Sequence, residues 1–417
     1  MVALRHGLLM SCAALLLGNA PLAIAQEATD LPPLRKKTIT DPYAATGLSA
    51  GGLRLFPSLE IGTGITSNVR GSATNPKADI ALELKPTLRF ESDWARHQWT
   101  GSSTIDVVRY AKENDLSTLS GKAETAFRLD IRRTTKADFT ASYNLSETGV
   151  ASTQLPNTAI GPRRDHNFNA GVAFTHDFGG LEGSIKTALA RGIYEDVDLT
   201  GGGTEDNSDR NYWAPTLTLR TALIDAGAPV KPFAEISYQP RIHDTEKDRN
   251  NLKRDSQGFA GSVGLTLNRG PIWEGEVALT YLLRRYADPS LETSQALGAI
   301  TRLVWRPTDL TSFEGTTGVG LDETATAGIS ATRSWTASLN MTHALRENLD
   351  LKAGLGFTLQ DTGTEFDKSN TATLGLDWQM NPNMTAGITY QGLWVNSGAS
   401  GGDYNDQRVM TSIILKR

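Results

Sequence analysis

The sequence has almost no cysteine. Its single cysteine, Cys12, lies within the first 25 residues, so a chain that loses those residues has none. Such a chain forms neither disulfides nor thiolate metal sites. Long apolar runs are also missing, because no stretch after residue 25 reaches the roughly 18 apolar residues that a membrane-spanning helix requires. If this chain enters a membrane, it must do so as a closed barrel, since lipid cannot satisfy an open sheet edge.

Charge of one sign is lacking as well. The chain carries 41 Lys and Arg against 46 Asp and Glu, a formal net charge of −5, which argues against nucleic acid as a partner. The mean hydropathy of −0.30 looks like that of a soluble protein. A transmembrane barrel has similar values, because only alternate residues meet lipid. Mean hydropathy therefore does not distinguish a soluble protein from a transmembrane barrel. The periodicity of the sequence is the informative feature.

Residues 1–25 predict a secretory signal peptide. Arg5 gives a positive start, residues 7–17 form a short apolar run, and Ala23-Ile24-Ala25 is an A-x-A cleavage site. A lipoprotein signal ending at Cys12 is the alternative, but it leaves almost no apolar region ahead of the cysteine. Residues 26–51 follow as an N-terminal tail in the periplasm. This tail is either a disordered leader or a segment that docks a periplasmic export partner.

A period of two runs through the rest of the chain. In residues 80–90 every even position is apolar or proline, and the odd positions include charged residues. The same alternation recurs in residues 119–131, 166–178, 181–193, 259–267, 273–283, 349–359, 372–380 and 384–394. It is typical of β-strands with one apolar and one polar face. Glycine, with 40 residues, lies inside these segments too often for helices. The sequence predicts an all-β chain.

The connections between these segments alternate in length. Short turns are expected at residues 93–96, 132–135, 179–180, 223–228, 269–270, 307–310, 345–348 and 381–383. Longer polar segments lie between them, among them residues 147–163, 195–209, 241–255, 361–370 and 396–406. Short turns on one side and long loops on the other are typical of outer-membrane barrels. We therefore predict one antiparallel transmembrane β-barrel over residues 52–417. It would have about 18 strands, short periplasmic turns, long extracellular loops and both termini in the periplasm.

The eight tryptophans provide an independent indication. Trp94 lies in a short turn, and the other seven have the apolar parity of their strands near strand ends. These seven are predicted to form two interfacial girdles: Trp99, Trp213, Trp273, Trp305, Trp335, Trp378 and Trp394. A soluble β-sandwich or propeller, the alternative fold, would bury tryptophan in mid-strand. The expected location is the bacterial cell outer membrane of a Gram-negative cell, with outer-membrane lipid against the apolar face.

The opposite parity predicts the interior of the barrel. Our lumen-facing candidates are Arg54, Glu83, Lys85, Arg89, Glu124, Arg128, Glu235, Glu276, Arg284 and Arg302. Charges at this density do not fit a dry core, whereas barrels of about this strand number leave an aqueous channel. Both signs occur in similar numbers, so strong selectivity for anions or cations is not expected. Most of these charges should form salt bridges on the wall.

The sequence contains few features that would support an enzymatic function. The six histidines are scattered, and none has the spacing of a metal site. A glycine-rich phosphate loop and a nucleophile elbow in a strand-to-helix context are missing too. We expect no catalytic residues, no metal and no cofactor, and the chain is not expected to be an enzyme.

The start of the predicted barrel carries a family resemblance. Asp41-Pro42, the segment GGLRLFPSLE at residues 51–60, Ser67-Asn68-Val69 and the turn SDWARH at residues 92–97 resemble the opening of the alphaproteobacterial outer-membrane β-barrel porin family. Members of this family are often associated with exopolysaccharide assembly and export. The resemblance therefore implies a conduit for exopolysaccharide, with a polysaccharide as substrate. One departure is the C-terminus, which ends in Lys416-Arg417 where outer-membrane barrels usually have an aromatic residue.

Two other functions stay open at this stage. The barrel could be a general diffusion porin for small hydrophilic solutes, or a structural or adhesive barrel whose lumen is closed. Tyr110, Tyr194 and Tyr212 have the parity to present sugar-stacking rings to the lumen, which is slender support for a polysaccharide. The sequence leaves the transported solute, the oligomeric state and any gating or plugging open. It also does not show whether the N-terminal tail docks a partner.

Overall fold

The computed structural model describes residues 43–417 apart from residues 151–154, 157, 225–227, 323, 325–328, 364 and 399–401. The strands of the first half are β1 (Leu48–Ala50), β2 (Leu53–Thr66), β3 (Asp79–Ser92), β4 (Gln98–Tyr110), β5 (Thr118–Arg132), β6 (Thr135–Thr148), β7 (Arg163–Asp177), β8 (Leu181–Tyr194), β9 (Val197–Asp198), β10 (Thr204–Glu205) and β11 (Tyr212–Leu223). The second half contains β12 (Val230–His243), β13 (Ser256–Arg269), β14 (Trp273–Tyr286), β15 (Ser294–Thr308), β16 (Thr311–Asp322), β17 (Thr332–Arg346), β18 (Leu349–Asp361), β19 (Phe366–Asn381), β20 (Met384–Asn396) and β21 (Tyr404–Lys416). Two short 3-10 helices, η1 (Asn114–Leu116) and η2 (Ser208–Arg210), lie in loops. Within the described residues, no helix is long and apolar enough to cross a membrane.

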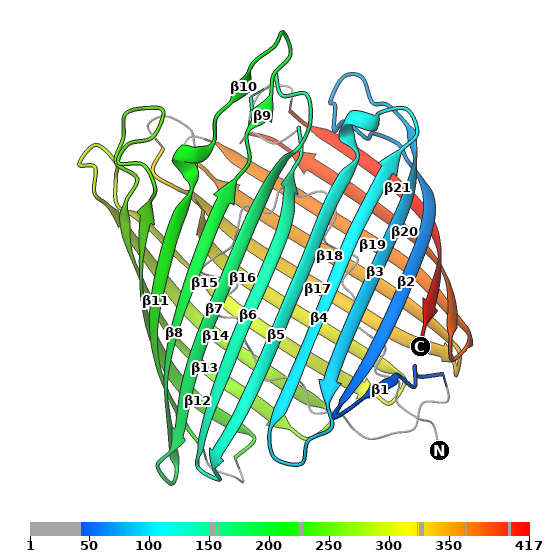
Figure 1. The fold of residues 1–417 in the computed structure, drawn as a ribbon, viewed down its shortest axis with the longest axis vertical. Coiled ribbons are helices and arrows are strands. Elements are labelled where there is room, and N and C mark those ends of the chain that lie inside the picture. Colours follow the sequence, from blue (N-terminus) through cyan, green and yellow to red (C-terminus); the bar gives the residue numbers. More distant parts are fainter. Residues whose placement is uncertain are drawn as a thin grey trace.

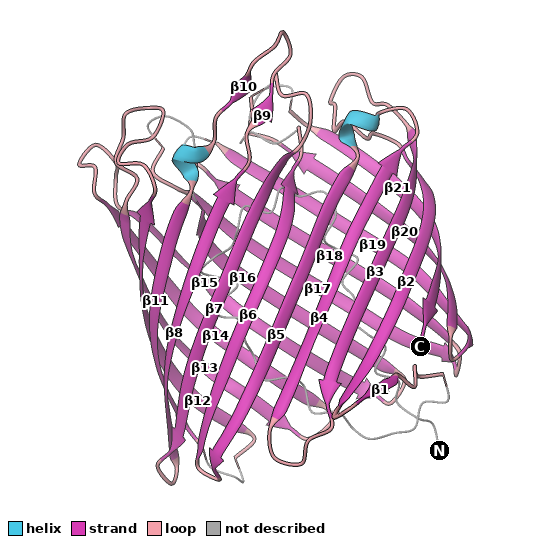
Figure 2. Cartoon of the chain, viewed as in Figure 1, coloured by secondary structure: helices cyan, strands magenta, loops and turns pink. Residues whose placement is uncertain are grey.

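Eighteen of these strands form one closed antiparallel barrel (Figures 1 and 2). Neighbours in sequence pair along the wall, and β8 pairs with β11 because β9 and β10 form a separate small hairpin between them. The barrel closes where β2 pairs with β21, from Ser58↔Lys416 to Thr66↔Arg408. Closure leaves no free sheet edge between the first and last strands. The prediction of a single all-β barrel of about 18 strands is confirmed.

The predicted N-terminal tail ends in a strand. Residues 48–50 form β1, which pairs with the start of β2 through Leu48↔Leu55 and Ala50↔Leu53. β21 reaches β2 only from Ser58 onwards, so β1 pairs with the part of β2 that β21 leaves open. Gly51 makes the tight turn between them with a φ of 63°, a conformation that favours glycine. The predicted signal peptide, and the tail before residue 43, lie outside the described residues.

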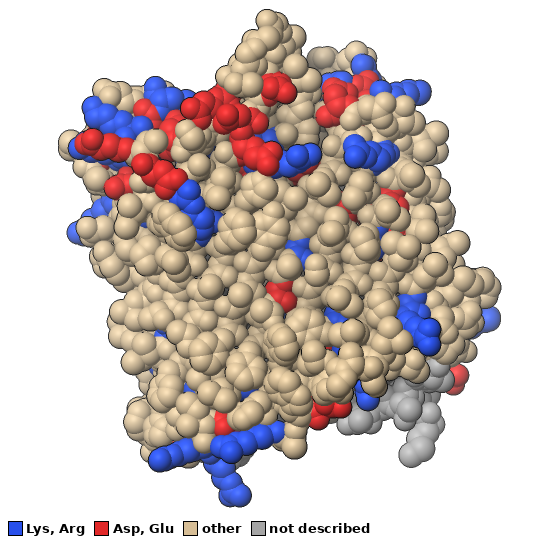
Figure 3. Space-filling model, in the orientation of Figure 1, with Lys and Arg blue, Asp and Glu red and all other residues tan. Residues whose placement is uncertain are grey.

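The alternation of apolar and polar residues in the sequence corresponds to the outer and inner faces of the barrel wall. In β3, Ile80 and Leu82 are 55% and 54% exposed, whereas their neighbour Ala81 is completely buried. The outer surface is therefore apolar over the middle of the barrel, and charged side chains gather mostly at its two ends (Figure 3). An exposed apolar surface of this extent indicates contact with a membrane or with another protein.

The two ends of the barrel differ in their connections. Short turns join the strands at the end where β1 and the C-terminal residue lie (lower end in Figure 1), which we name the turn end. The longer connections lie at the other end, named the loop end. One predicted loop, at residues 361–370, is wrong in its length: β18 continues to Asp361 and β19 begins at Phe366. Polar residues such as Ser369 and Asn370 suggested a loop, but they lie in β19 and pair with β20.

One seam of the wall departs from the regular ladder. Among the described residues, the pairs between β15 and β16 run from Thr308↔Thr311 only to Thr301↔Thr317. Residues 294–300 of β15 and 318–322 of β16 have no partner in that ladder. β15 stays paired with β14 as far as Ser294, and β16 stays paired with β17 as far as Asp322. The ladder between β15 and β16 therefore ends before the strands reach the loop end.

Candidate functional site: the inner wall of the barrel

Ion pairs between strands line the inner wall. Arg220 of β11 contacts Glu276 of β14 at 2.7 Å and Glu235 of β12 at 3.6 Å. Thr266 of β13 donates its hydroxyl to Glu276 at 2.7 Å. β11 to β14 are consecutive in the wall, and their alternation places all of these side chains on the same face. The guanidinium of Arg220 also lies 3.7 Å from the ring centroid of Phe233, in a cation–π contact.

The same arrangement recurs around the barrel. Further pairs between strands, with their N–O distances, are Lys85–Asp106 (3.7 Å), Arg128–Asp138 (2.9 Å), Arg302–Glu314 (2.8 Å), Arg306–Glu274 (3.6 Å) and Lys352–Asp377 (2.6 Å), and Lys122–Glu124 (2.6 Å) is a pair within β5. Each pair joins opposite charges, so these pairs together add no net charge to the wall. Partly exposed pairs of this kind contribute only about 0–1 kcal/mol each to stability. Their main effect is therefore to make the inner wall hydrophilic, and they add little to the stability of the barrel.

The ten lumen-facing candidates lie on the strand faces opposite to the exposed apolar side chains. The structure brings Glu235 and Glu276 together around Arg220, and it pairs Lys85, Glu124, Arg128 and Arg302 with other charges. The remaining four candidates are Arg54, Glu83, Arg89 and Arg284, and the cross-strand register makes Arg54 and Arg89 diagonal neighbours on β2 and β3. Arg54 is exposed near the turn end, and Arg89 lies 4.3 Å from the ring centroid of Phe56.

Arg284 belongs to a different environment from the exposed lining. Its side chain is completely buried, and it donates hydrogen bonds to Ser256 at 2.8 Å and to Gln239 at 3.1 Å. Asp322 of β16 is also buried and lies within electrostatic reach of Arg284 and Arg241. This part of the inner wall is therefore a packed polar cluster toward the loop end, not a surface open to water.

The three tyrosines with lumen parity do not present free rings. Tyr110, Tyr194 and Tyr212 are 4%, 5% and 2% exposed. Two guanidinium groups, those of Arg163 and Arg210, lie 5.0 and 4.7 Å from the centroid of Tyr194. The guanidinium of Arg241 lies 4.4 Å from that of Tyr212, and Arg408 donates to the hydroxyl of Tyr110 at 3.0 Å. Arginines therefore take the place that a stacked sugar would need.

Part of this wall comes from residues that the sequence pattern placed in loops. Arg163 and Arg241 stood in segments predicted as loops, but they belong to β7 and β12. Arg163 is bonded to Asp165 through its Nε, at 2.6 Å, and neither side chain is more than 2% exposed. The available signal was the alternation itself, because Arg163 shares its parity with the polar residues that follow it in β7. Polar composition near the loops hid that signal.

The tryptophans lie at both ends of the outer face. Near the turn end, Trp273 and Trp305 stack with their ring centroids 5.4 Å apart. Trp99 and Trp378 also lie at this end, whereas Trp213 and Trp394 lie near the loop end, 44% and 39% exposed. Trp335 differs from this pattern. It packs against a buried apolar cluster, and its indole N–H donates to the carbonyl of Leu297 at 2.9 Å.

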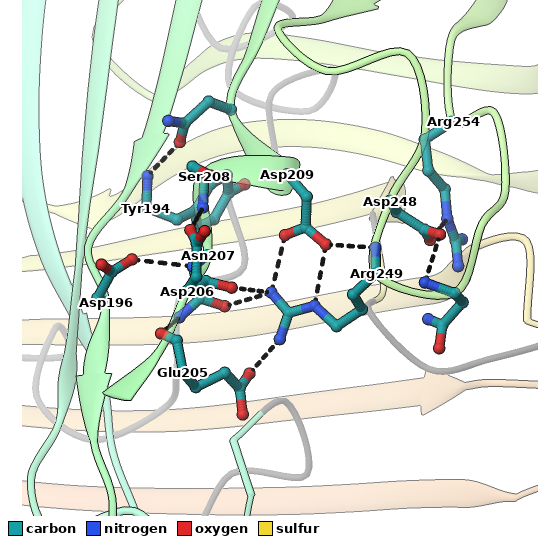
Figure 4. A network of polar contacts seen from close by, with 12 residues as sticks. Tyr194, Asp196, Glu205, Asp206, Asn207, Ser208, Asp209, Asp248, Arg249 and Arg254 are labelled. Atoms are coloured by element: carbon teal, nitrogen blue, oxygen red, sulfur yellow. Dashed lines mark hydrogen bonds and ion pairs between the residues drawn. The ribbon is translucent and has the colours of Figure 1, made fainter. Parts of the chain in front are cut away.

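Arg249 joins two long loops at the loop end (Figure 4). It lies in the loop between β12 and β13. Its guanidinium donates two hydrogen bonds to Asp209, at 2.9 and 2.8 Å, and its backbone N–H donates a third, at 2.8 Å. It also binds Glu205 and the side chain of Asn207, both from the loop between β8 and β11. In the same loop as Arg249, Arg254 donates to the carbonyl of Ile329 at 2.8 Å. Three loops are thus held together above the barrel.

The pKa shifts of Arg249 and Asp209 favour their charged forms. The hydrogen bond with Asp209 is the largest cause that raises the pKa of Arg249. Burial alone would raise the pKa of Asp209, but its hydrogen bonds and charge interaction with Arg249 outweigh burial and lower it from the ordinary 3.8. A carboxyl with a lowered pKa stabilises the folded state above its ordinary pKa, and this contribution is lost as the pH falls below that value. The assembly should therefore persist at neutral pH and loosen only in strong acid.

Replacing Arg249 should free these loops without unfolding the barrel. Arg249→Ala removes charge-assisted hydrogen bonds that are each worth about 1.5–3 kcal/mol, so proteolysis of residues 195–211 should accelerate about tenfold or more. Limited proteolysis of the folded protein measures this rate. Lys247→Ala is the matched control, because Lys247 bonds Asn251 within its own loop. Equal cleavage rates in the two variants would show that Arg249 does not hold the loops together.

Comparison with known proteins identifies the family of this chain. No curated protein matches the chain significantly. Among solved structures, a ferric enterobactin receptor mutant of Pseudomonas aeruginosa is 7% identical, with a TM-score of 0.41, over 87% of this chain and 80% of that chain. The outer membrane protein opdK of the same organism is 10% identical, with a TM-score of 0.40, over 87% and 99%. Likenesses this distant carry no argument about function. A family model described as "Putative beta-barrel porin 2" matches residues 41–417. The chain belongs to this β-barrel porin family.

Proposed function

We propose that this protein is a pore in the bacterial cell outer membrane. Its closed barrel, its exposed apolar band and the aromatic side chains at both ends of the outer face support this location. Membership of a porin family supports the same proposal. Export through a signal peptide at residues 1–25 would bring the chain to that membrane.

The pore is proposed to conduct hydrophilic solutes. The observation that carries this proposal is the lining of partly exposed ion pairs of both signs on the inner wall. In the pair Lys122–Glu124, for example, the side chains are 51% and 47% exposed. Conduction requires contacts weak enough for the solute to leave again. A wall of paired charges attracts water and polar groups without holding one sign of ion tightly. No catalytic role and no cofactor form part of this proposal.

The proposed solute is an exopolysaccharide chain on its way out of the cell. Support comes from the resemblance of residues 41–99 to a family often associated with exopolysaccharide export. The buried tyrosines add nothing to it, because arginines cover Tyr194 and Tyr212. General diffusion of small hydrophilic solutes is the second candidate, and the mixed-charge lining favours it equally. A docking role of residues 26–51 toward a periplasmic export partner also stays a proposal.

One deletion strain separates the two candidates. If the protein exports polysaccharide, its loss should lower surface or secreted glycan severalfold while the influx of small hydrophilic solutes stays normal. If it is a diffusion porin, glycan should be normal and influx should be slower. Both quantities are measured in the same strain, with and without a plasmid copy of the gene. Normal glycan with slow influx would reject the export proposal, and no change in either would reject the pore.

A further inference from the structure

Beyond the last rung of the ladder between β15 and β16, the two strands overlap instead of lying edge to edge. We call this part of the wall the seam. Val319 and Leu321 of β16 are 0% and 3% exposed, and they pack on Leu282 of β14 and Ala296 of β15. Both of those residues lie on the inner face, because their neighbours Tyr281 and Leu297 are exposed on the outer face. Residues 318–322 therefore lie inside the barrel, against the inner surface of β14 and β15.

A glycine permits this close approach. A Cβ on Gly298 of β15 would lie 2.6 Å from the Cβ of Val319, closer than real Cβ contacts. Gly298 therefore gives β16 the room to slide behind β15. Because the two strands overlap here, the last rung between them is Thr301↔Thr317.

Side chains, not a ladder, close the free edge of β15. Trp335 donates its indole N–H to the carbonyl of Leu297 at 2.9 Å. Thr317 donates its hydroxyl to the carbonyl of Ala299 at 2.8 Å. A backbone group on a lipid-facing edge must be satisfied within the protein, and these two bonds satisfy the carbonyls of Leu297 and Ala299. Separating the seam breaks side-chain bonds that can re-form, so this part of the wall can open without unzipping a ladder.

The seam connects two apolar surfaces. On its outer side, Leu297 is 56% exposed and Leu279 is 54% exposed, within the apolar band. On its inner side lies the buried apolar cluster, with Ala260 and Ile300 at its border. Arg284 lies two residues beyond Leu282 along β14, and both Arg284 and Arg241 lie within electrostatic reach of the single carboxylate of Asp322. An apolar surface beside arginines matches a molecule with a hydrocarbon tail and an anionic head.

We propose that the seam between β15 and β16 is a lateral port that binds an anionic, acyl-chain amphiphile from the outer leaflet, with Trp335 as its plug. The port rests on the membrane location proposed above and does not depend on the identity of the hydrophilic solute. The tail of the amphiphile would take the place of Val319 and Leu321 on the inner face of β14 and β15. The outer side of the seam would contact the hydrocarbon of the membrane. We therefore propose an acyl chain as the occupant.

A reversible disulfide across the overlap tests the port. Gly298→Cys with Val319→Cys places two thiols where a bond needs only a small shift, since disulfides have Cβ atoms about 3.5–4.5 Å apart. The mature chain offers a cysteine-free background if residues 1–25 are removed. The protein is reconstituted in vesicles, and binding of 11-(dansylamino)undecanoic acid is followed by its fluorescence. Oxidation should weaken binding about tenfold or more, and reduction should restore it.

A second disulfide is the matched control. Thr316→Cys with Ser338→Cys replaces two hydroxyls that lie 2.7 Å apart in the intact ladder between β16 and β17. It should leave binding of the dansyl acid unchanged, because it does not cross the seam. The port is wrong if the unmodified protein binds no dansyl acid saturably. It is also wrong if oxidation across the overlap leaves binding intact, or if both disulfides weaken binding equally.

Two tryptophan variants test whether Trp335 blocks the port. Here the expected change is faster association of the dansyl acid, not weaker binding. Trp335→Phe keeps an aromatic ring but loses the bond to Leu297, so association of the dansyl acid should become roughly fivefold faster. Trp394→Phe, at an exposed tryptophan of the same end, should not change it. Unchanged association in Trp335→Phe would contradict the plug. Ion conductance of the same vesicles reports separately on the hydrophilic pore, so failure of one proposal is distinguishable from failure of the other.

Discussion

Leu339→Arg should destabilise the folded barrel by about 2–4 kcal/mol in a lipid bilayer. Leu339 lies in the middle of β17 and is 47% exposed on the outer face. Its cross-strand neighbour Leu355 is 62% exposed on the same face. An arginine at this depth would lie far from water at either end of the barrel. Urea unfolding in vesicles, followed by tryptophan fluorescence, measures the change in free energy.

The next residue of the same strand supplies the control. Asn340 faces the interior, and its cross-strand neighbour in β16 is Glu314. Asn340→Arg adds the same charge beside a carboxylate on a wettable wall, so the expected loss is below about 1 kcal/mol. Similar losses in the two variants would mean that the outer face does not contact hydrocarbon. That result would overturn the membrane location as well as the assignment of the faces.

Asp165→Leu should cost about 3–5 kcal/mol, because it removes one partner of a buried ion pair. The side chains of Arg163 and Asp165 are 0% and 2% exposed, and Asp165 also accepts a hydrogen bond from Thr148 at 2.8 Å. Without the carboxylate, the guanidinium of Arg163 would stay buried without its charge partner. The same unfolding measurement in vesicles gives the loss.

Two further variants decide whether burial is the cause. Arg163→Met with Asp165→Leu removes both charges and should recover most of the lost stability. Asp138→Leu breaks the pair with Arg128, whose side chains are 28% and 32% exposed, and should cost at most about 1 kcal/mol. A double variant as unstable as Asp165→Leu alone would show that the pair is needed for its packing shape and not for charge balance.

The sequence by itself determined the strands, their two faces and the alternation of short and long connections. Alternation is a local property, because successive side chains of a strand point to opposite sides whatever the strand pairs with. Closure followed from the absence of a spanning helix together with an apolar outer face, since only a closed sheet satisfies its backbone in lipid. Sequence reasoning therefore predicted the single barrel and the inward parity of residues such as Glu276.

Only the tertiary structure decided which inward residues meet. Arg220 and Glu276 come from strands that are not neighbours in the wall, and their contact depends on side-chain length and on the curvature of the sheet. The overlap at the seam was equally hidden. Val319 and Leu321 have the same apolar pattern whether they face lipid or pack on the inner surface of β14 and β15. A period of two fixes the face of a strand, but the path of the neighbouring strand decides what that face touches.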